Sequence, residues 1–204
     1  MYFPECNVYN NHGANILNRI GNVIRQLDSQ KMEQLKEDVL GAERIFIVGS
    51  GRSGLVGRLF AMRVMHMGIE VYVVGETNTP RIGSSDLLVA ISGSGTTPSV
   101  ISAAEKANEI GAKVVGIIVK KDQCTTPLSN CVNYLIRLER RQVTSQERWA
   151  FAINRNQDKK ISLLPMGSLF ELSTLIFLET LLCGLIEDEH ITESEMKHRH
   201  TILE

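Results

Sequence analysis

The chain has 204 residues, of which 43% are hydrophobic and 22% charged, which is typical of a globular domain with a sizeable core. This composition excludes disordered and collagen-like chains. Because 22 Lys and Arg balance 23 Asp and Glu, the net charge of -1 offers no bulk attraction to nucleic acid or to an anionic membrane, and a bound anion must be held by local groups.

Amphipathic helices come first, between residues 14 and 40, where apolar side chains recur at helical spacing. After Ala42 the period changes. Continuous apolar runs then predict strands at residues 45–48, 69–74, 87–91, 114–119 and 132–138. Helical patterns at residues 54–67 and 98–110 lie between these runs.

Strands that alternate with helices imply right-handed crossovers and a parallel sheet covered on both faces. We therefore expect residues 44–138 to form the core of an α/β domain, a three-layer α-β-α sandwich. In such sheets, ligands bind beyond the carboxyl ends of the strands. Two glycine/serine turns stand at such ends, GSGRSG at residues 49–54 and SGSGTT at residues 92–97. Both can direct backbone N–H groups toward an anion, which predicts one phosphorylated ligand held from both sides.

The first turn alone leaves a second ligand class open. It fits GxGxxG, and Glu76 follows the next strand where a ribose-binding acid would stand, so a nicotinamide- or flavin-dependent oxidoreductase is a competing interpretation. The hydroxyls and the arginine of the turn argue against it, since dinucleotide sites bring bare backbone close to a pyrophosphate. The second turn, followed by Pro98 at a helix start, favours a phosphomonoester, which prefers many neutral donors. An ordinary serine-rich turn with a helix cap is the alternative there.

Residues 139–160 break the strand and helix pattern with six basic side chains and few apolar ones. We interpret them as an exposed connector, although their charge would also suit an acidic partner. The apolar stretch at residues 172–186 contains Glu179 and is shorter than the ~20 residues of a membrane span, so a buried or subunit-contacting helix is expected. The four cysteines lack CxxC spacing and no leader precedes the helices, which predicts reduced thiols in a cytoplasmic protein.

The two turns belong to an ordered series of motifs along the chain. GSGRSG is followed by GETNTP at residues 75–80, then by SGSGTT, by PMGSLFE at residues 165–171 and by RHTILE at residues 199–204. In this order the motifs resemble the sugar isomerase (SIS) domain family and, within it, its 6-phospho-3-hexuloisomerase branch. The resemblance covers nearly the whole chain.

The resemblance implies one SIS domain over residues 1–204, with a five-stranded parallel sheet of flavodoxin-like topology, C-terminal helices at residues 165–204 and a homotetramer. It implies the conversion of D-arabino-3-hexulose 6-phosphate to fructose 6-phosphate through a cis-enediol. That step follows the condensation of formaldehyde with ribulose 5-phosphate, and it needs no metal or organic cofactor. A non-catalytic phosphosugar sensor shares the fold, but the chain has no segment with room for a helix-turn-helix.

Site residues are carried over from the matching motifs. The phosphate contacts fall on Ser53 in the first turn and on Ser92, Ser94 and Thr97 in the second, with Ser50 and Arg52 nearby.

The isomerisation also needs a base and an acid, because a proton leaves one carbon beside the carbonyl and returns to another. Glu171 lies among apolar residues in PMGSLFE, where a carboxylate with a raised pKa would suit the base; a helix-start acid favoured by the helix dipole is the alternative.

For the acid, a histidine is the natural group. His200 in the matching RH pair is the first candidate, although a histidine this close to the end of the sequence is by default a surface residue. In the wider family a histidine from a neighbouring subunit completes the site, so the tail is expected to reach another subunit's pocket. His66 is the second candidate, with a role at a helix C-terminus as its alternative.

Overall fold

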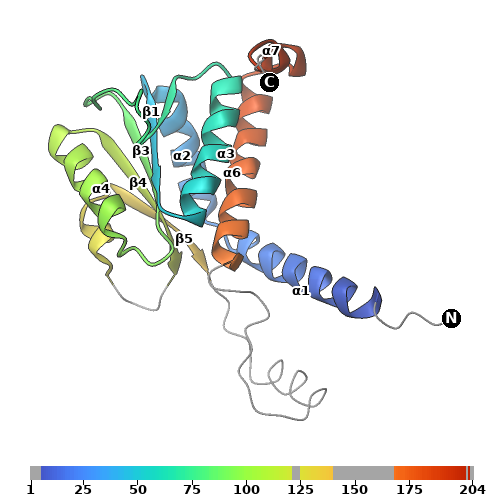
Figure 1. Ribbon diagram of the computed structural model, residues 1–204. Coiled ribbons are helices and arrows are strands. Elements are labelled where there is room, and N and C mark those ends of the chain that lie inside the picture. The colour runs from blue at the N-terminus through green and yellow to red at the C-terminus, as the bar shows by residue number, and fades with distance from the viewer. Residues whose placement is uncertain (1–5, 121–124, 140–167, 201, 203–204) are drawn as a thin grey trace.

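The computed structural model describes residues 6–120, 125–139, 168–200 and 202. Within them, five strands form one parallel sheet in the order β2-β1-β3-β4-β5 (Figure 1). The strands are β1 (Ile45–Gly49), β2 (Val71–Val73), β3 (Leu87–Ile91), β4 (Lys113–Lys120) and β5 (Tyr134–Glu139). The flavodoxin-like order 2-1-3-4-5 expected from the sequence is confirmed.

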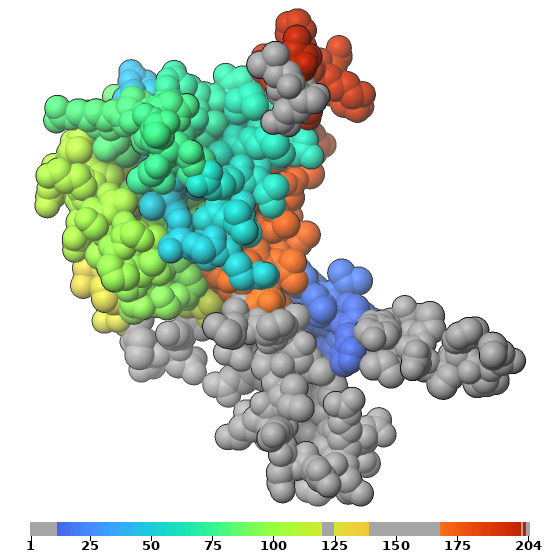
Figure 2. All heavy atoms as spheres, in the orientation of Figure 1, coloured from blue at the N-terminus to red at the C-terminus, as the bar shows by residue number. Residues whose placement is uncertain are grey.

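Helices cover both faces of the sheet, as expected for a three-layer sandwich. They are α1 (Cys6–Ile24), α2 (Ser29–Gly41), α3 (Arg52–His66), α4 (Pro98–Ile110), the short 3-10 helix η1 (Pro127–Asn130), α6 (Ser168–Asp188) and α7 (Glu193–His198). α2, α3 and α6 lie on one face and α4 on the other, while α1 extends outward from the body of the domain (Figure 1). α3 and α6 run side by side along the visible surface (Figure 2).

The central strands β1 and β3 are apolar throughout because helices cover both of their faces. Ile45 and Ile47 point into the core beneath α3 and α6, whereas Phe46 and Val48 point into the core beneath α4. All five residues of β3 are buried. Continuous apolar runs, rather than alternating ones, are what a doubly covered parallel sheet requires.

A buried ion pair fixes how β1 and β3 are aligned. The two strands pair in register, with Ile45 opposite Leu87. Arg44 and Asp86 each stand one residue before this pair, and the Arg44 guanidinium donates to both carboxylate oxygens, with Nε 3.1 Å from Oδ1 and Nη2 2.7 Å from Oδ2. Because the Asp86 side chain is fully buried, a shift in register would leave its charge without this partner.

The long C-terminal helix α6 is the apolar helix that the sequence predicted. By length and composition alone it could span a membrane, and 44% of its apolar window is buried in the fold. Phe177, Leu181 and Leu185 are almost wholly buried in the same core as α3. α6 therefore acts as a core helix of the domain.

Element boundaries differ from the sequence predictions mainly where the pattern is weakest. α1 begins at Cys6, eight residues before the predicted start, and β2 has three residues where six were expected. At β2 the chain needs Ile69 and Glu70 to cross from α3 to the sheet edge, and the Glu70 carbonyl accepts from the Ile45 amide at 2.9 Å. Of the predicted connector at 139–160, Glu139 ends β5 and the remainder lies outside the described residues.

The packing of α2 generates a stability prediction. Leu35 is fully buried in the core, whereas its neighbour Gln34 is exposed. Leu35→Ala should lower the free energy of unfolding by about 2–5 kcal/mol, because it removes buried methyl groups and leaves a cavity. Gln34→Ala should change it by less than about 0.5 kcal/mol. Urea denaturation at one protein concentration measures the free energy of unfolding of both variants. Equal losses would contradict the placement of Leu35 on the buried face of α2.

Candidate active site

The two glycine/serine turns lie side by side because of the strand pairing. Gly49, the last residue of β1, is paired with Ile91, the last residue of β3. Ser50 and Ser92 follow directly, and neighbouring strands are about 5 Å apart. The strand order reverses between β1 and β3, and this is where open α/β sheets bind ligands.

The first turn leads directly into α3. Gly51 adopts a left-handed φ of +56°, which redirects the chain so that the helix begins at Arg52. Within the described part of the chain, the hydroxyls of Ser50 and Ser53 have no hydrogen-bond partner, so both can donate to a ligand. The first amide groups of α3 also face this turn without intrahelical partners.

The second turn contains a network of hydroxyl groups. The Ser92 and Thr97 hydroxyls are 2.9 Å apart, and Ser94 Oγ accepts from the amide and from the hydroxyl of Thr96. Thr97 is the N-cap residue of α4, but its side chain makes no capping bond. The interpretation of this turn as an ordinary capped helix start therefore does not fit the role of Thr97.

A segment that the sequence analysis did not single out supports the second turn. Gly95 has a φ of +65°, and a methyl group on it would lie 2.5 Å from the Thr126 hydroxyl. The Gly95 carbonyl accepts from the Leu128 amide at 3.1 Å. Thr126 and Ser129 form a capping box at η1, so this short helix holds the turn in place. A threonine directly before Pro127 is the sequence signal for such a cap.

The first turn of α6 completes the site from a distant part of the chain. The ring of Phe170 fills the space above Gly93, where a methyl group would lie 2.9 Å from Cδ1. On the next residue, Glu171 Oε2 lies 3.7 Å from Nε of Arg52. Phe170 and Glu171, both in the first turn of α6, thus contact the second and the first glycine/serine turn respectively.

The Glu171 carboxylate is placed as a reactive group would be. Its side chain is 13% exposed, and Oε2 is buried without a hydrogen-bond partner. A buried oxygen that no hydrogen bond satisfies is costly in a folded protein and calls for an explanation. A ligand proton beside Oε2 would provide the missing partner, which is the arrangement that a general base needs.

The two candidate histidines lie together at the opposite end of α3. The rings of His66 and His200 are stacked with centroids 5.0 Å apart, and Arg199 Nη1 donates to the His66 carbonyl at 3.3 Å. Burial lowers the pKa of His66, and the neighbouring His200 and Arg63 lower it further. Because α3 has 15 residues, about 20 Å of helix separates His66 from Arg52.

The structure therefore brings most of the predicted site residues together, but not all of them. Six predicted phosphate ligands and the predicted base share the carboxyl edge of the sheet: Ser50, Arg52, Ser53, Ser92, Ser94, Thr97 and Glu171. Within one chain, His66 and His200 are not part of this group. Either histidine could act beside Glu171 only from a second copy of the chain.

Two observations bear on cofactors. Glu76, which a dinucleotide site would use for a ribose, forms an ion pair with Arg58. Among the described residues, no three His, Cys, Asp or Glu side chains are grouped closely enough to hold a metal ion. The polar side chains of the site are hydroxyls, one guanidinium and one carboxylate, which suit a phosphate ester and a proton transfer.

The contact between Gly95 and Thr126 yields a binding prediction. Gly95→Ala should weaken the binding of fructose 6-phosphate at least tenfold, because its methyl group displaces the second turn. Gly111→Ala is the matched control: Gly111 also has a left-handed φ, +90°, but its nearest neighbour would be 3.7 Å away and it lies at the other edge of the sheet. Calorimetric titration should show unchanged affinity in the control, and equal losses would contradict the support role of Thr126.

Comparison with known proteins agrees with this geometry. The SIS domain model matches residues 39–142. The 3-hexulose-6-phosphate isomerase of Methanocaldococcus jannaschii is 38% identical over 170 residues, which are 83% of this chain and 82% of the relative. The enzyme of the same name from Methylomonas aminofaciens is 35% identical, covering 93% and 96%.

The fold also matches a solved structure. A Methanococcus jannaschii protein, for which its crystal structure inferred a function of 3-hexulose-6-phosphate isomerase, superimposes with a TM-score of 0.74. It is 34% identical, and the match covers 92% of this chain and 98% of the other. Sequence, fold and site geometry point the same way, and the chain belongs to the SIS domain family.

Proposed function

We propose that the chain is a 6-phospho-3-hexuloisomerase, which interconverts D-arabino-3-hexulose 6-phosphate and fructose 6-phosphate. The observation that carries this proposal is the position of Glu171. Its unsatisfied carboxylate oxygen stands beside two hydroxyl-lined turns that can hold one phosphate group. Relatives named 3-hexulose-6-phosphate isomerase, aligned over most of the chain, support the same reaction.

The reaction is a proton transfer between two neighbouring carbons. With the phosphate held by the two turns, Glu171 removes the proton from C2 of the 3-ketose, and the electrons form a C2–C3 double bond while the C3=O double bond opens and its oxygen takes a proton from the acid. The resulting cis-enediol takes a proton at C3 while the C2 oxygen loses one, which yields the 2-ketose. No atom is gained or lost, so a base and an acid within reach are sufficient.

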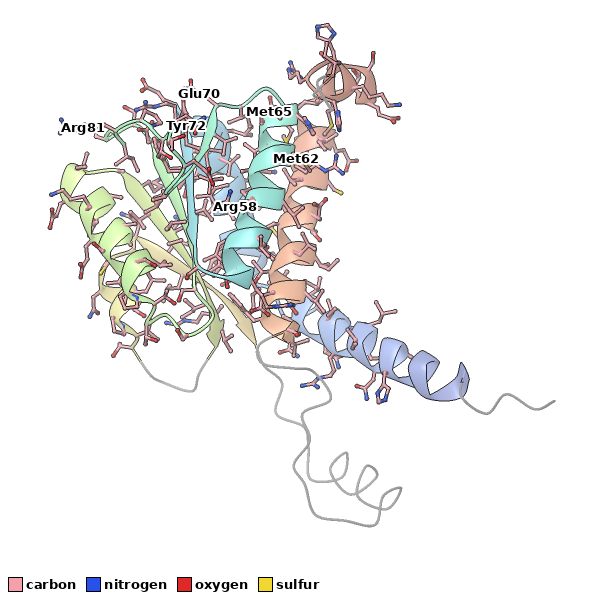
Figure 3. All side chains as sticks on the ribbon, in the orientation of Figure 1. Arg58, Met62, Met65, Glu70, Tyr72 and Arg81 are labelled. Carbon is pink, nitrogen blue, oxygen red and sulfur yellow. The ribbon has the colours of Figure 1, made fainter. Side chains whose placement is uncertain are left out.

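We infer that the acid is His200 of a second copy of the chain. α3 carries an exposed apolar stripe, Leu55, Leu59, Met62 and Met65, with exposed fractions of 41–61%. Figure 3 shows Met62 and Met65 on this helix, with Arg58 about one turn before Met62. Exposed apolar patches of this kind mark contact surfaces.

A two-fold axis across this stripe would set two α3 helices antiparallel. The His66 end of one α3 would then lie next to the Arg52 end of the other. This follows because His66 and Arg52 stand at the two ends of the same helix within each chain. Each site would combine Glu171 of one copy with His200 of its partner. In this arrangement, His66 would support His200 through ring stacking.

A non-catalytic phosphosugar sensor is the second candidate function. It would need the two turns but would have no use for a buried, unsatisfied carboxylate. The position of Glu171 therefore favours the enzyme. We further propose a cytoplasmic homotetramer that acts directly after the condensation of formaldehyde with ribulose 5-phosphate.

Replacement of the base tests the reaction. Glu171→Gln should lower kcat by roughly 100- to 10,000-fold, because the amide cannot accept the carbon-bound proton. The affinity for fructose 6-phosphate should change little, since the phosphate turns are untouched. Turnover can be followed by NMR in deuterated water as deuterium enters C3 of fructose 6-phosphate.

Two comparison variants sharpen this result. Glu179→Gln makes the same change two turns along α6 and should keep full turnover. The double variant Ser94→Ala, Thr97→Ala should mainly raise KM, because it removes phosphate donors. Normal turnover by Glu171→Gln would reject the base assignment, and an absence of deuterium exchange in the wild type would favour the sensor.

Mixing two inactive variants tests whether the site spans two copies. Glu171→Gln and His200→Ala should each be inactive alone. After joint refolding in equal amounts, about a quarter of the sites should pair an intact Glu171 with an intact His200, because random assembly supplies each with a probability of one half. The mixture should recover activity toward that fraction of the wild type.

Refolding each variant by itself is the control and should restore nothing. No recovery in the mixture, with mixed oligomers demonstrated by mass spectrometry, would place the acid within the same chain as the base.

A further inference from the structure

Arg52 occupies a position that phosphate binding alone does not explain. It is the first residue of α3, adjacent to Ser53 of the first turn, and its guanidinium is 59% exposed. Nε nevertheless points to Oε2 of Glu171 at 3.7 Å. The guanidinium therefore lies between the site for the phosphate and the proposed base.

We propose that Arg52 is a positioning residue that makes proton abstraction depend on a bound phosphate. In the empty site its guanidinium pairs with Glu171 and occupies the side of the carboxylate from which a carbon-bound proton would be taken. A phosphate in the two turns draws the guanidinium away and leaves Oε2 open to the sugar. This inference rests on the proposed isomerase function.

The geometry of the pair allows such an exchange. At 3.7 Å the contact is longer than a hydrogen bond, and Oε2 has no hydrogen-bond partner. Only the arginine end of the pair is exposed, at 59% against 13% for Glu171, so the guanidinium keeps its contact with water when it turns from the carboxylate to a phosphate. A long arginine side chain, more than half exposed, can also rotate without disturbing the core.

The two anions differ in how strongly they attract a guanidinium. A phosphomonoester carries nearly two negative charges and three acceptor oxygens, whereas the carboxylate carries one charge. Arginine binds phosphate through two parallel N–H donors, which the present contact with Glu171 does not provide. A phosphate that occupies the turns beside Ser53 would therefore outcompete Glu171 for Arg52.

The arrangement has a consequence for specificity. A ketose without a phosphate would enter a site in which Arg52 still covers Glu171, and its proton would not be removed. The enzyme would then discriminate between phosphorylated and unphosphorylated ketoses in proton abstraction as well as in binding. The hydroxyls of the two turns, which reach only the phosphate, could not produce that effect.

The test uses Arg52→Gln on two substrates. With fructose 6-phosphate, KM should rise about tenfold to a hundredfold through loss of a charged hydrogen bond, while kcat stays within a few-fold. With D-xylulose, a five-carbon ketose that lacks C6 and its phosphate, deuterium exchange at C3 should be faster in the variant than in the wild type. A merely structural role would slow both reactions.

Phosphite supplies an independent readout. Added to D-xylulose, it should fill the phosphate site, release Glu171 in the wild type and accelerate exchange several-fold; in Arg52→Gln it should have no effect. Arg81→Gln is the matched control, since Arg81 is an exposed arginine at the opposite edge of the sheet (Figure 3). It should behave as the wild type in every assay.

Two outcomes would overturn the inference. Slower exchange of D-xylulose by Arg52→Gln would assign Arg52 to the stabilisation of the enediol, and equal phosphite activation in both proteins would remove its link to the phosphate. Failure of the isomerase function itself would appear separately, as a wild type that does not exchange C3 of fructose 6-phosphate.

Discussion

The in-register pairing of β1 with β3 is the constraint on which the site depends. Each strand ends in a turn of glycines and hydroxyls, and only the alignment of Gly49 with Ile91 sets the two turns at one level. The Arg44–Asp86 pair anchors this alignment at the other end of the same strands. A buried charge at the amino ends of these strands thus determines whether one phosphate group could contact both turns. A slip of one residue would also turn every buried side chain of a strand to the opposite face of the sheet.

The proposed base comes from a distant part of the chain. Glu171 is separated from the first turn by more than a hundred residues, and α6 brings it there because the apolar side of that helix packs beside α3 in the core. The contact between Phe170 and Gly93 then sets how closely the helix end approaches the second turn. Glycine is required at this point for the space that it leaves, so one packing contact positions both the proposed phosphate site and the proposed base.

Local chemistry accounts for what the sequence predicted well. The strands could be predicted because burial on both faces requires continuous apolar runs. The turns could be predicted because their glycines and hydroxyl residues are neighbours in the sequence. Thr126 was missed, since its effect on Gly95 depends on two segments about thirty residues apart. The stacking of His66 on His200, about 20 Å of helix from Arg52, could not be predicted either, because it depends on where α7 packs in three dimensions.

The proposed site would separate recognition from chemistry by charge. Neutral hydroxyls and backbone amides would hold the phosphate, which is the arrangement that a doubly charged group favours. Two ionic groups of the candidate site, Arg52 and Glu171, lie 3.7 Å apart and would be available for control of the proton transfer. A binding domain could be built from the two turns alone. The feature that would turn this sheet edge into a reactive site is a carboxylate with a buried oxygen that has no hydrogen-bond partner, and a bound sugar would supply that partner.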